Sequence, residues 1–216
     1  MSRRAWLTPF AALLAVGCSS EPPPFKPNYT GGTGYFLDNA AANRKSSDVA
    51  LPTSFVDYKG EKVDLTLYRE GGKSPKNLVL VVVRGIPQSP GGVPCQFCVA
   101  QANSMAANYA DFQKRDAEVL VVFPGPSEKV QDFIDQSAKK PQLPFPLLLD
   151  KDMQVCDKLG IKGDLAKPST YVLDKKGNVV YAYVGETLTD RPSLKAIFGQ
   201  LDKLQPKPDV PPPTKK

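Results

Sequence analysis

Residues 78–98 have the sequence LVLVVVRGIPQSPGGVPCQFC, and this stretch predicts the fold class. Six consecutive apolar residues, Leu78 to Val83, are typical of a strand that is buried on both faces of a sheet. A loop rich in glycine and proline separates this strand from Cys95 and Cys98, which stand at the start of a helical pattern. On one face of a helix, side chains at positions i and i+3 lie about 5–6 Å apart, so two thiols there can close a reversible disulfide. Thiol redox chemistry is therefore the leading hypothesis.

Strand and helix patterns alternate on both sides of this stretch. Residues 55–67 alternate around a Lys-Gly turn and predict a hairpin. A helical pattern follows Cys98, and residues 119–123 predict a second buried strand, so the two buried strands should pair in parallel. Residues 171–184 predict another hairpin, and Pro192 opens the last helix. We therefore expect an α/β fold with a mixed central sheet and helices on both faces.

The first residues of the chain predict an export signal. Arg3 and Arg4 precede an apolar run, residues 10–16, that is too short to span a bilayer. Residues 14–18, with the sequence LAVGC, resemble a bacterial lipobox, in which the cysteine becomes lipidated after cleavage. The resemblance implies that the preceding seventeen residues are a lipoprotein signal peptide and that Cys18 carries the lipid. Simple secretory cleavage, with Cys18 as a bystander, is the alternative.

Two segments of low periodicity flank the expected domain, which spans residues 51–204. Residues 18–50 contain proline and glycine runs and predict a lipidated N-terminus followed by a flexible linker. Residues 205–216 are rich in proline and lysine and predict a disordered tail. Ser19 after the lipidated cysteine is the pattern associated with outer-membrane sorting, so we expect a cell-envelope protein that is anchored by its lipid and faces the periplasm. Disulfides persist in that compartment.

The charge of the chain excludes a strong nucleic-acid binder. There are 28 basic and 22 acidic residues, and loss of the signal would remove two of the basic ones. No block of lysine and arginine is interleaved with aromatic residues, as a nucleic-acid surface would require. We therefore expect no nucleic-acid partner, and the expected partners are protein or small-molecule thiols and disulfides and, through the N-terminal lipid, the membrane.

The third cysteine of the expected domain, Cys156, has a different environment. It lies between Met153 and Leu159 on one helical face, which predicts a buried thiol; a role as an additional resolving cysteine is the alternative. The chain has no histidine, and a tetrahedral zinc site would need a fourth ligand beyond Cys95, Cys98 and Cys156. We expect no metal and no cofactor other than a redox-active disulfide.

The chain resembles the thioredoxin superfamily, and within it the redoxin group. That group includes proteins of the alkyl hydroperoxide reductase/thiol-specific antioxidant type and membrane-tethered thiol-disulfide oxidoreductases. The resemblance covers roughly residues 50–204 and rests on the C-x-x-C after the buried strand, on LLLD at 147–150 and on KPSTYVLD at 167–174. It implies a thioredoxin-like three-layer fold. It also implies a cis-proline at Pro168, although a proline at the start of a strand is the alternative.

The peroxidase branch of this group uses a Pro-x-x-x-Thr/Ser-x-x-Cys motif and a distant arginine. If Cys98 is aligned with the attacking cysteine of that motif, Cys95 takes the place of the threonine or serine, and Gly91 takes that of the proline. Pro168 takes the place of the arginine, and Arg84, at the end of the buried strand, is the alternative source of positive charge. These departures disfavour a peroxidase.

Thiol-disulfide exchange needs an exposed thiolate, a resolving thiol and a docking surface. Cys95, at the helix N-terminus, is expected to be the nucleophile because the helix dipole favours its thiolate, and Cys98, one turn inward, is expected to resolve. Gln96 and Phe97 bring no positive charge, which argues against a strongly oxidising disulfide. The resemblance implies that three consecutive residues form the wall for a substrate peptide, namely Lys167, Pro168 and Ser169.

The main hypothesis is therefore a cell-envelope thiol-disulfide oxidoreductase that acts through Cys95 and Cys98. Two alternatives stay open. One is a thiol-dependent peroxidase, which would share the cysteine pair. The other is a non-catalytic redoxin-fold module in which the pair forms a structural disulfide.

Overall fold

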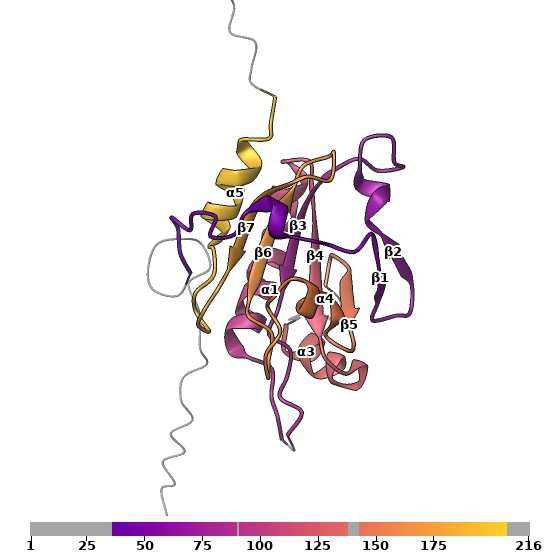
Figure 1. Ribbon diagram of the computed structural model, residues 1–216, viewed down its shortest axis with the longest axis vertical. Helices are drawn as coiled ribbons and strands as arrows, with labels where there is room; N and C mark the ends of the chain where they lie inside the picture. Colours follow the sequence, from indigo (N-terminus) through magenta and orange to yellow (C-terminus); the bar gives the residue numbers. More distant parts are fainter. Residues whose placement is uncertain (1–35, 90, 138–142, 207–216) are drawn as a thin grey trace, which may run out of the picture.

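The computed structural model describes residues 36–89, 91–137 and 143–206, and they form one seven-stranded sheet (Figure 1). Its strand order is β2-β1-β5-β4-β3-β6-β7. The central strands β3, β4 and β5 are parallel, and the other pairings are antiparallel, so the predicted mixed sheet is confirmed. The strands are β1 (Ser54–Asp57), β2 (Lys62–Asp64), β3 (Asn77–Val82), β4 (Ala117–Pro124), β5 (Leu147–Asp150), β6 (Ser169–Leu173) and β7 (Val179–Val184).

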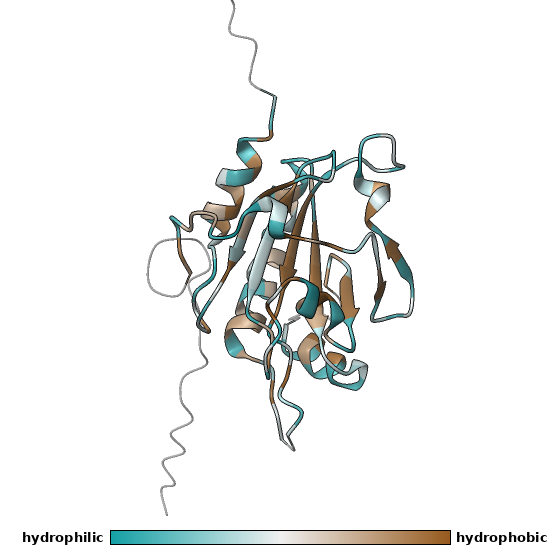
Figure 2. Ribbon diagram, in the orientation of Figure 1, coloured by the Kyte–Doolittle hydropathy of each residue, from teal (hydrophilic) through white to brown (hydrophobic). Residues whose placement is uncertain are grey.

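Strands β3 and β4 form the centre of the sheet because their sequences are apolar at almost every position. Every residue of both strands is buried, as expected for parallel strands covered on two faces. Figure 2 shows these strands as the most continuously hydrophobic part of the fold. Successive side chains alternate between the faces, so Val79 and Val81 enter one core while Leu78 and Leu80 enter the other.

Helices cover both faces, which completes the predicted three-layer α/β architecture. The first core lies under α1, α2, α3 and α5, and the second lies under α4 and the loop that follows it. In Figure 1, α5 lies beside β7 at one edge of the sheet, and the β1–β2 hairpin forms the opposite edge. The helices are α1 (Gln96–Ala107), α2 (Tyr109–Gln113), α3 (Val130–Ser137), α4 (Gln154–Lys158) and α5 (Leu194–Asp202).

One predicted hairpin ends earlier than its hydrophobic pattern suggested. The strand pairing stops at Asp64, and residues Leu65–Tyr68 form a 3₁₀ helix, η2. The Asp64 carboxylate accepts the N–H of Thr66 at 2.9 Å and caps this turn. A local side-chain bond to the backbone therefore overrides the alternation of apolar residues.

The segment 36–50, assigned to a linker from the sequence, lies against the domain. Asn43 donates its side-chain amide to the carbonyl of Val184 and accepts the N–H of the same residue, both at 2.9 Å. The N–H of Asn43 also donates to Ala182 in β7 at 3.1 Å. Strand β7 is the last in the sheet, so this segment provides hydrogen-bond partners for backbone groups of an edge strand.

The predictions for the chain ends fall largely outside the described residues. The signal peptide, Cys18 and the tail after residue 206 are among the parts that the structure does not describe. Within the described ranges, no helix is both long and apolar enough to cross a bilayer.

Candidate active site

The two cysteines of the C-x-x-C segment stand at the start of α1. Cys95 is the N-cap residue with an extended backbone, and its carbonyl accepts the N–H groups of Cys98 and Val99 at 2.9 and 3.1 Å. Cys95 is partly exposed, whereas Cys98 is 1% exposed, and both thiols are free. The helix start therefore presents one accessible sulfur and holds the second sulfur one turn inward.

A third functional group, Arg191, joins the pair from a distant part of the chain. Its Nη2 donates to Cys98 Sγ at 3.1 Å, its Nη1 donates to Gln101 Oε1 at 2.6 Å, and its Nε donates to the carbonyl of Leu188 at 2.9 Å. The side chain is 1% exposed. Among the described residues, no carboxylate oxygen lies within 4 Å of this guanidinium. Of the three groups that accept these hydrogen bonds, only the Cys98 sulfur can carry a negative charge.

Residues 185–191, which we call the arginine loop, fix Arg191 in this position. The Tyr183 hydroxyl donates to the carboxylate of Asp190, and the N–H of Glu186 donates to the same carboxylate at 2.9 Å. Gly185 lies so close to the carbonyl oxygen of Asp190 that a side chain at this position would overlap it. At the far end, the N–H of Leu37 donates to the carbonyl of Arg191 at 2.7 Å.

The two thiols of the pair have different pKa values because their surroundings differ. A hydrogen bond from the Cys98 thiol lowers the pKa of Cys95 to about 5; burial opposes this shift, while the backbone N–H groups of Cys98 and Phe97 and the charge of Arg191 support it. Burial raises the pKa of Cys98 well above its usual value, and its hydrogen bond to Cys95 acts in the same direction. At neutral pH the accessible Cys95 is thus the thiolate. This is the arrangement expected of a nucleophile at 95 and a resolving thiol at 98, and the roles themselves stay predictions.

Sequence reasoning missed Arg191 because it lies 93 residues from Cys98. It stands two residues before Ser193, the N-cap of α5, where a hydroxyl accepts the N–H of Ala196. A cation at a helix N-terminus is unfavourable for the helix dipole. That conflict was the available signal, because a residue that breaks a local rule often serves a site elsewhere.

Arg84, the alternative source of charge, contributes only its backbone. Its N–H donates to Cys98 Sγ at 3.3 Å. Its Nε is buried and lacks a hydrogen-bond partner among the described residues, and none of the described contacts joins its guanidinium to either sulfur. The loop after β3 therefore places a backbone donor, rather than a charge, beside the buried thiol.

The residues of the predicted substrate wall lie at the start of β6. The described residues contain no cis peptide bond, so the expected cis-proline at Pro168 is wrong, and the residue is a buried proline at the start of β6. Ser169 is also buried, and its hydroxyl donates to the carbonyl of Lys167 at 3.0 Å. Lys167 pairs with Glu186 at 2.6 Å, and the carbonyl of Pro168 accepts the N–H of Gly185 at 2.7 Å. This segment braces the arginine loop, and its role as a wall for a substrate peptide stays a prediction.

Cys156 is buried, as predicted, and it lies on the opposite face of the sheet from Cys98. The Asp150 carboxylate accepts the N–H groups of Val155 and Cys156 at 3.1 and 2.9 Å and so caps the start of α4. Burial raises the pKa of the Cys156 thiol. Because the sheet separates the two sulfurs, the alternative of a further resolving cysteine does not fit this structure.

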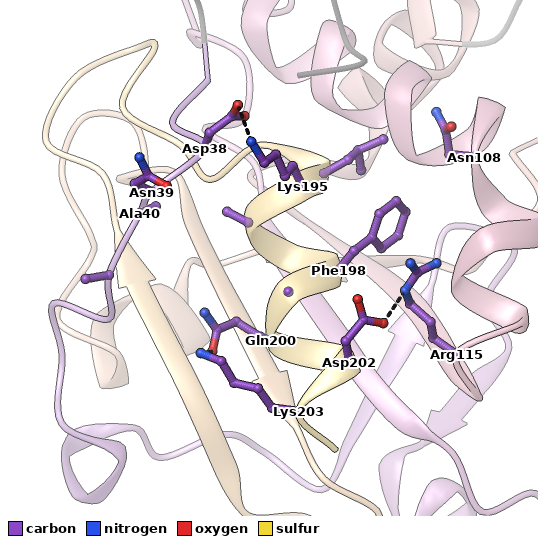
Figure 3. A pocket seen from close by; sticks show the side chains of 14 residues that line it. Asp38, Asn39, Ala40, Asn108, Arg115, Lys195, Phe198, Gln200, Asp202 and Lys203 are labelled. Carbon is purple, nitrogen blue, oxygen red and sulfur yellow. Dashed lines mark hydrogen bonds and ion pairs between the residues drawn. The ribbon is translucent and has the colours of Figure 1, made fainter. Parts of the chain in front are cut away.

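One described groove lies away from the cysteine pair. It has a volume of about 730 Å³ between α5 and residues 38–41 (Figure 3). Its main charges are already paired, Lys195 with Asp38 at 3.6 Å and Arg115 with Asp202 at 2.7 Å. None of its lining residues belongs to the cysteine pair or is Arg191. We therefore assign the site to the C-x-x-C helix and the arginine loop.

Comparisons with known proteins agree with this chemistry. Residues 42–182 match the AhpC/TSA family. The chain is 31% identical to the chloroplastic peroxiredoxin Q of Triticum aestivum over 159 residues, which cover 67% of this chain and 66% of that protein. It is 32% identical to peroxiredoxin Bcp of Escherichia coli K12 over 120 residues, which cover 56% of this chain and 67% of that protein. The chain thus spans about two thirds of the length of these relatives.

Solved structures show the same fold at lower sequence identity. The yeast mitochondrial 1-Cys peroxiredoxin aligns with a TM-score of 0.56 at 15% identity and covers 76% of each chain. The DsbF protein of Mycobacterium tuberculosis aligns with a TM-score of 0.52 at 19% identity, over 74% of this chain and 98% of that one. With the family match over residues 42–182 and the cysteine pair at the start of α1, this chain belongs to the AhpC/TSA family of thioredoxin-like oxidoreductases.

Proposed function

We propose that the protein is a thiol-dependent peroxidase in which Cys95 is the attacking thiolate and Cys98 the resolving thiol. The observation that carries this proposal is the buried guanidinium of Arg191, which donates to Cys98 Sγ at 3.1 Å beside the accessible Cys95. A fixed positive charge suits peroxide reduction, because negative charge develops on the departing oxygen. The proposal reverses the preference drawn from the sequence, since Arg191 supplies the arginine that seemed to be missing. Similarity to proteins named peroxiredoxin supports the same choice.

The reaction would proceed in two steps on this pair. First, Cys95 Sγ attacks one oxygen of the hydroperoxide, the O–O bond breaks, and the departing oxygen takes a proton from solvent to leave as water or an alcohol. Cys95 becomes a sulfenic acid. Second, the Cys98 sulfur attacks the sulfenic sulfur, water leaves, and the disulfide forms. A thiol reductant then returns both cysteines to the reduced state.

Cys95, rather than Cys98, takes the first step because only Cys95 is accessible. Cys98 is 1% exposed and lies under the first turn of α1. The thiolate is the reactive form of a cysteine, and Cys95 has a pKa of about 5. This assignment differs from the alignment considered in the sequence analysis, in which Cys98 took the attacking position.

Peroxide consumption by cysteine variants tests the proposal. With hydrogen peroxide and dithiothreitol, we expect the wild-type chain and Cys156→Ala to consume peroxide faster than the reductant alone, and Cys95→Ser to be inactive. In Cys98→Ser the Cys95 sulfenic acid should persist and be trapped by dimedone. Activity kept in Cys95→Ser and lost in Cys98→Ser would reverse the two roles. No consumption above the reductant blank by the wild-type chain would reject the peroxidase.

Arg191 offers a second test with a matched control. Arg191→Met should slow the first step about 100-fold, the typical cost of removing one donor that stabilises developing charge. Arg84→Met removes a guanidinium that contacts neither sulfur and should leave the rate close to that of the wild type. Stopped-flow measurement of the single-turnover oxidation of reduced protein separates this step from the later reduction. Equal slowing in both variants would remove Arg191 from the mechanism.

Thiol-disulfide exchange is the second candidate, and one observation favours it. Cys98 lies one turn from the accessible Cys95 at the start of α1, and the hydrogen bond from its thiol is the largest cause of the lowered pKa of Cys95, so a resolving thiol is close to the sulfur that would carry a mixed disulfide. In a Cys98→Ser variant, an exchanger should trap partners as mixed disulfides through Cys95. Absence of adducts under conditions that trap a control oxidoreductase would eliminate this candidate. A structural disulfide would give neither adducts nor peroxide consumption.

We also propose that Cys18 anchors the chain to a bacterial envelope membrane through a lipid. The support is the lipobox-like sequence at residues 14–18, which lies outside the described residues. Cys18→Ser should prevent incorporation of labelled palmitate and shift the protein from the membrane fraction to the soluble fraction. A membrane fraction unchanged by this substitution would contradict the anchor. Separation of inner and outer membranes would then test the expected outer-membrane location.

A further inference from the structure

The guanidinium of Arg191 is buried without a carboxylate partner. Two of its three hydrogen bonds go to neutral oxygens, the carbonyl of Leu188 and the side-chain amide of Gln101. The neighbouring carboxylate of Asp190 is occupied by the Tyr183 hydroxyl and the N–H of Glu186. A buried charge is costly unless an opposite charge compensates it. In the described part of the chain, the cysteine pair supplies that compensation.

Oxidation of the pair removes the compensation. A dithiol pair that has lost one proton carries one negative charge, whereas the Cys95–Cys98 disulfide carries none. The guanidinium would then keep its two neutral acceptors while remaining 1% exposed. The oxidised state therefore contains an uncompensated buried cation that the reduced state lacks. Since a disulfide becomes more oxidising when its reduced form is stabilised, the fold should favour the dithiol.

We propose that the Cys95–Cys98 disulfide is strongly oxidising and that a small monothiol of the glutathione class is sufficient to reduce it. This inference rests on the proposed function in one respect, because it identifies the thiol reductant that would complete the proposed peroxidase cycle. It also reverses the expectation from Gln96 and Phe97, because the positive charge comes from the arginine loop rather than from within the C-x-x-C segment.

The reduction can be followed bond by bond. The thiolate of one monothiol attacks the accessible Cys95 Sγ, the Cys95–Cys98 bond breaks, and the electron pair passes to Cys98 Sγ. That sulfur receives hydrogen bonds from Arg191 Nη2 at 3.1 Å and from the N–H of Arg84 at 3.3 Å, so the leaving thiolate forms beside two donors. A second monothiol attacks the sulfur of the bound first one and releases Cys95. Two monothiols become one small disulfide, and the protein gains two electrons.

Equilibration with glutathione tests the proposal directly. The whole chain carrying Cys18→Ser, so that Cys18 takes no part, is incubated in buffers of defined reduced and oxidised glutathione, quenched by alkylation and weighed by mass spectrometry. In the Arg191→Met variant the equilibrium should move at least about tenfold towards the disulfide, which corresponds to about 30 mV. Arg191→Lys, which keeps the charge, should move it less. An unchanged equilibrium in Arg191→Met would overturn the role of the guanidinium.

A second measurement does not depend on how the Arg191 variants fold. If the disulfide is strongly oxidising, the wild-type fold must be less stable when oxidised than when reduced, because the two redox states and the two folding states form one thermodynamic cycle. Denaturant unfolding with the Cys18→Ser background in each redox state should therefore give the lower midpoint for the oxidised protein. A higher midpoint for the oxidised protein, as a structural disulfide would give, overturns the proposal.

Neither measurement uses peroxide, so the two proposals fail separately. A disulfide that equilibrates as expected in a protein that consumes no peroxide would keep this inference and reject the peroxidase. Peroxide consumption by a protein whose disulfide resists glutathione would do the reverse.

Discussion

At the scale of single residues, Cys95 depends on one neighbouring thiol for its charge. The largest cause of its lowered pKa is the hydrogen bond from Cys98, ahead of the backbone donors and Arg191. Cys98→Ala removes that donor and should raise the pKa of Cys95, whereas Cys98→Ser keeps a hydroxyl donor and should leave it closer to 5. The pH dependence of iodoacetamide labelling at Cys95 measures both values. Identical curves in the two variants would show that the Cys98 donor is unimportant.

The same residue makes stability depend on pH. The pKa of Cys95 falls from 9.0 to about 5 on folding, so the folded state releases this proton more readily than the unfolded state. The contribution of Cys95 to the free energy of unfolding is fully present above pH 9 and is lost as the pH falls through 5. Unfolding free energies of the reduced protein should therefore rise more steeply between pH 5 and 9 than those of Cys95→Ser. Parallel curves would contradict a perturbed Cys95.

The residue scale is also where sequence reasoning was least complete. The cysteine pair was identifiable because its spacing and its preceding strand are local signals. Arg191 was not, because its role depends on the contact with Cys98, which lies 93 residues earlier in the chain. Its geometry comes from tertiary packing, which a single sequence does not reveal.

At the scale of elements, the arginine loop determines where the guanidinium lies. A methyl group at Gly185 would overlap the carbonyl oxygen of Asp190 and lie 3.0 Å from the ring of Pro168. Gly185→Ala should therefore displace the loop, lower the unfolding free energy by about 1–3 kcal/mol as overpacking does, and raise the pKa of Cys95 by moving Arg191 away. Denaturant unfolding and iodoacetamide labelling check these two effects.

A second glycine provides the control for this substitution. Gly199, within α5, has nothing within 4 Å of an added methyl group. Gly199→Ala should raise the unfolding free energy by about 0.5–1 kcal/mol, because alanine is the better helix former, and should leave the labelling of Cys95 unchanged. Equal stabilities for the two alanine variants would show that the arginine loop tolerates the added methyl group.

Helices and strands were predictable from the sequence where their hydrophobic patterns are long. The buried strands, the parallel pairing of β3 with β4, and the amphipathic α5 follow from apolar runs and periodicities in the sequence. The residues that cap the helices were harder to predict. Asp150 lies four residues before α4, and its carboxylate reaches the helix only because β5 ends beside it. Such ends depend on tertiary contacts more than on local propensity.

At the scale of the whole molecule, residues 36–50 complete the sheet from outside the predicted domain. Asn43 makes two hydrogen bonds to Val184 through its side chain. Asn43→Ala should lower the unfolding free energy by about 1–2 kcal/mol, at about 1 kcal/mol for each bond lost. Asn39→Ala, at an exposed position nearby, should have little effect. Chemical denaturation of both variants tests whether this segment belongs to the fold.

The extent of the domain could not be predicted because this contact leaves no trace in hydropathy. The segment binds β7 through backbone groups and the Asn43 amide, and it adds only isolated apolar residues such as Ala40 and Val49 to the cores, so it shows neither strand alternation nor a helical face. The polar composition of residues 36–50 therefore suggested a linker, whereas in the structure this segment is hydrogen-bonded along β7.

The bridge between Leu37 and Pro192 gives the molecule a mechanical property. The N–H of Leu37 bonds to the carbonyl of Arg191, and the carbonyl of Leu37 accepts the N–H of Ser193. A force applied to the chain at Leu37 would therefore act directly on the backbone of the residue whose guanidinium contacts the buried sulfur.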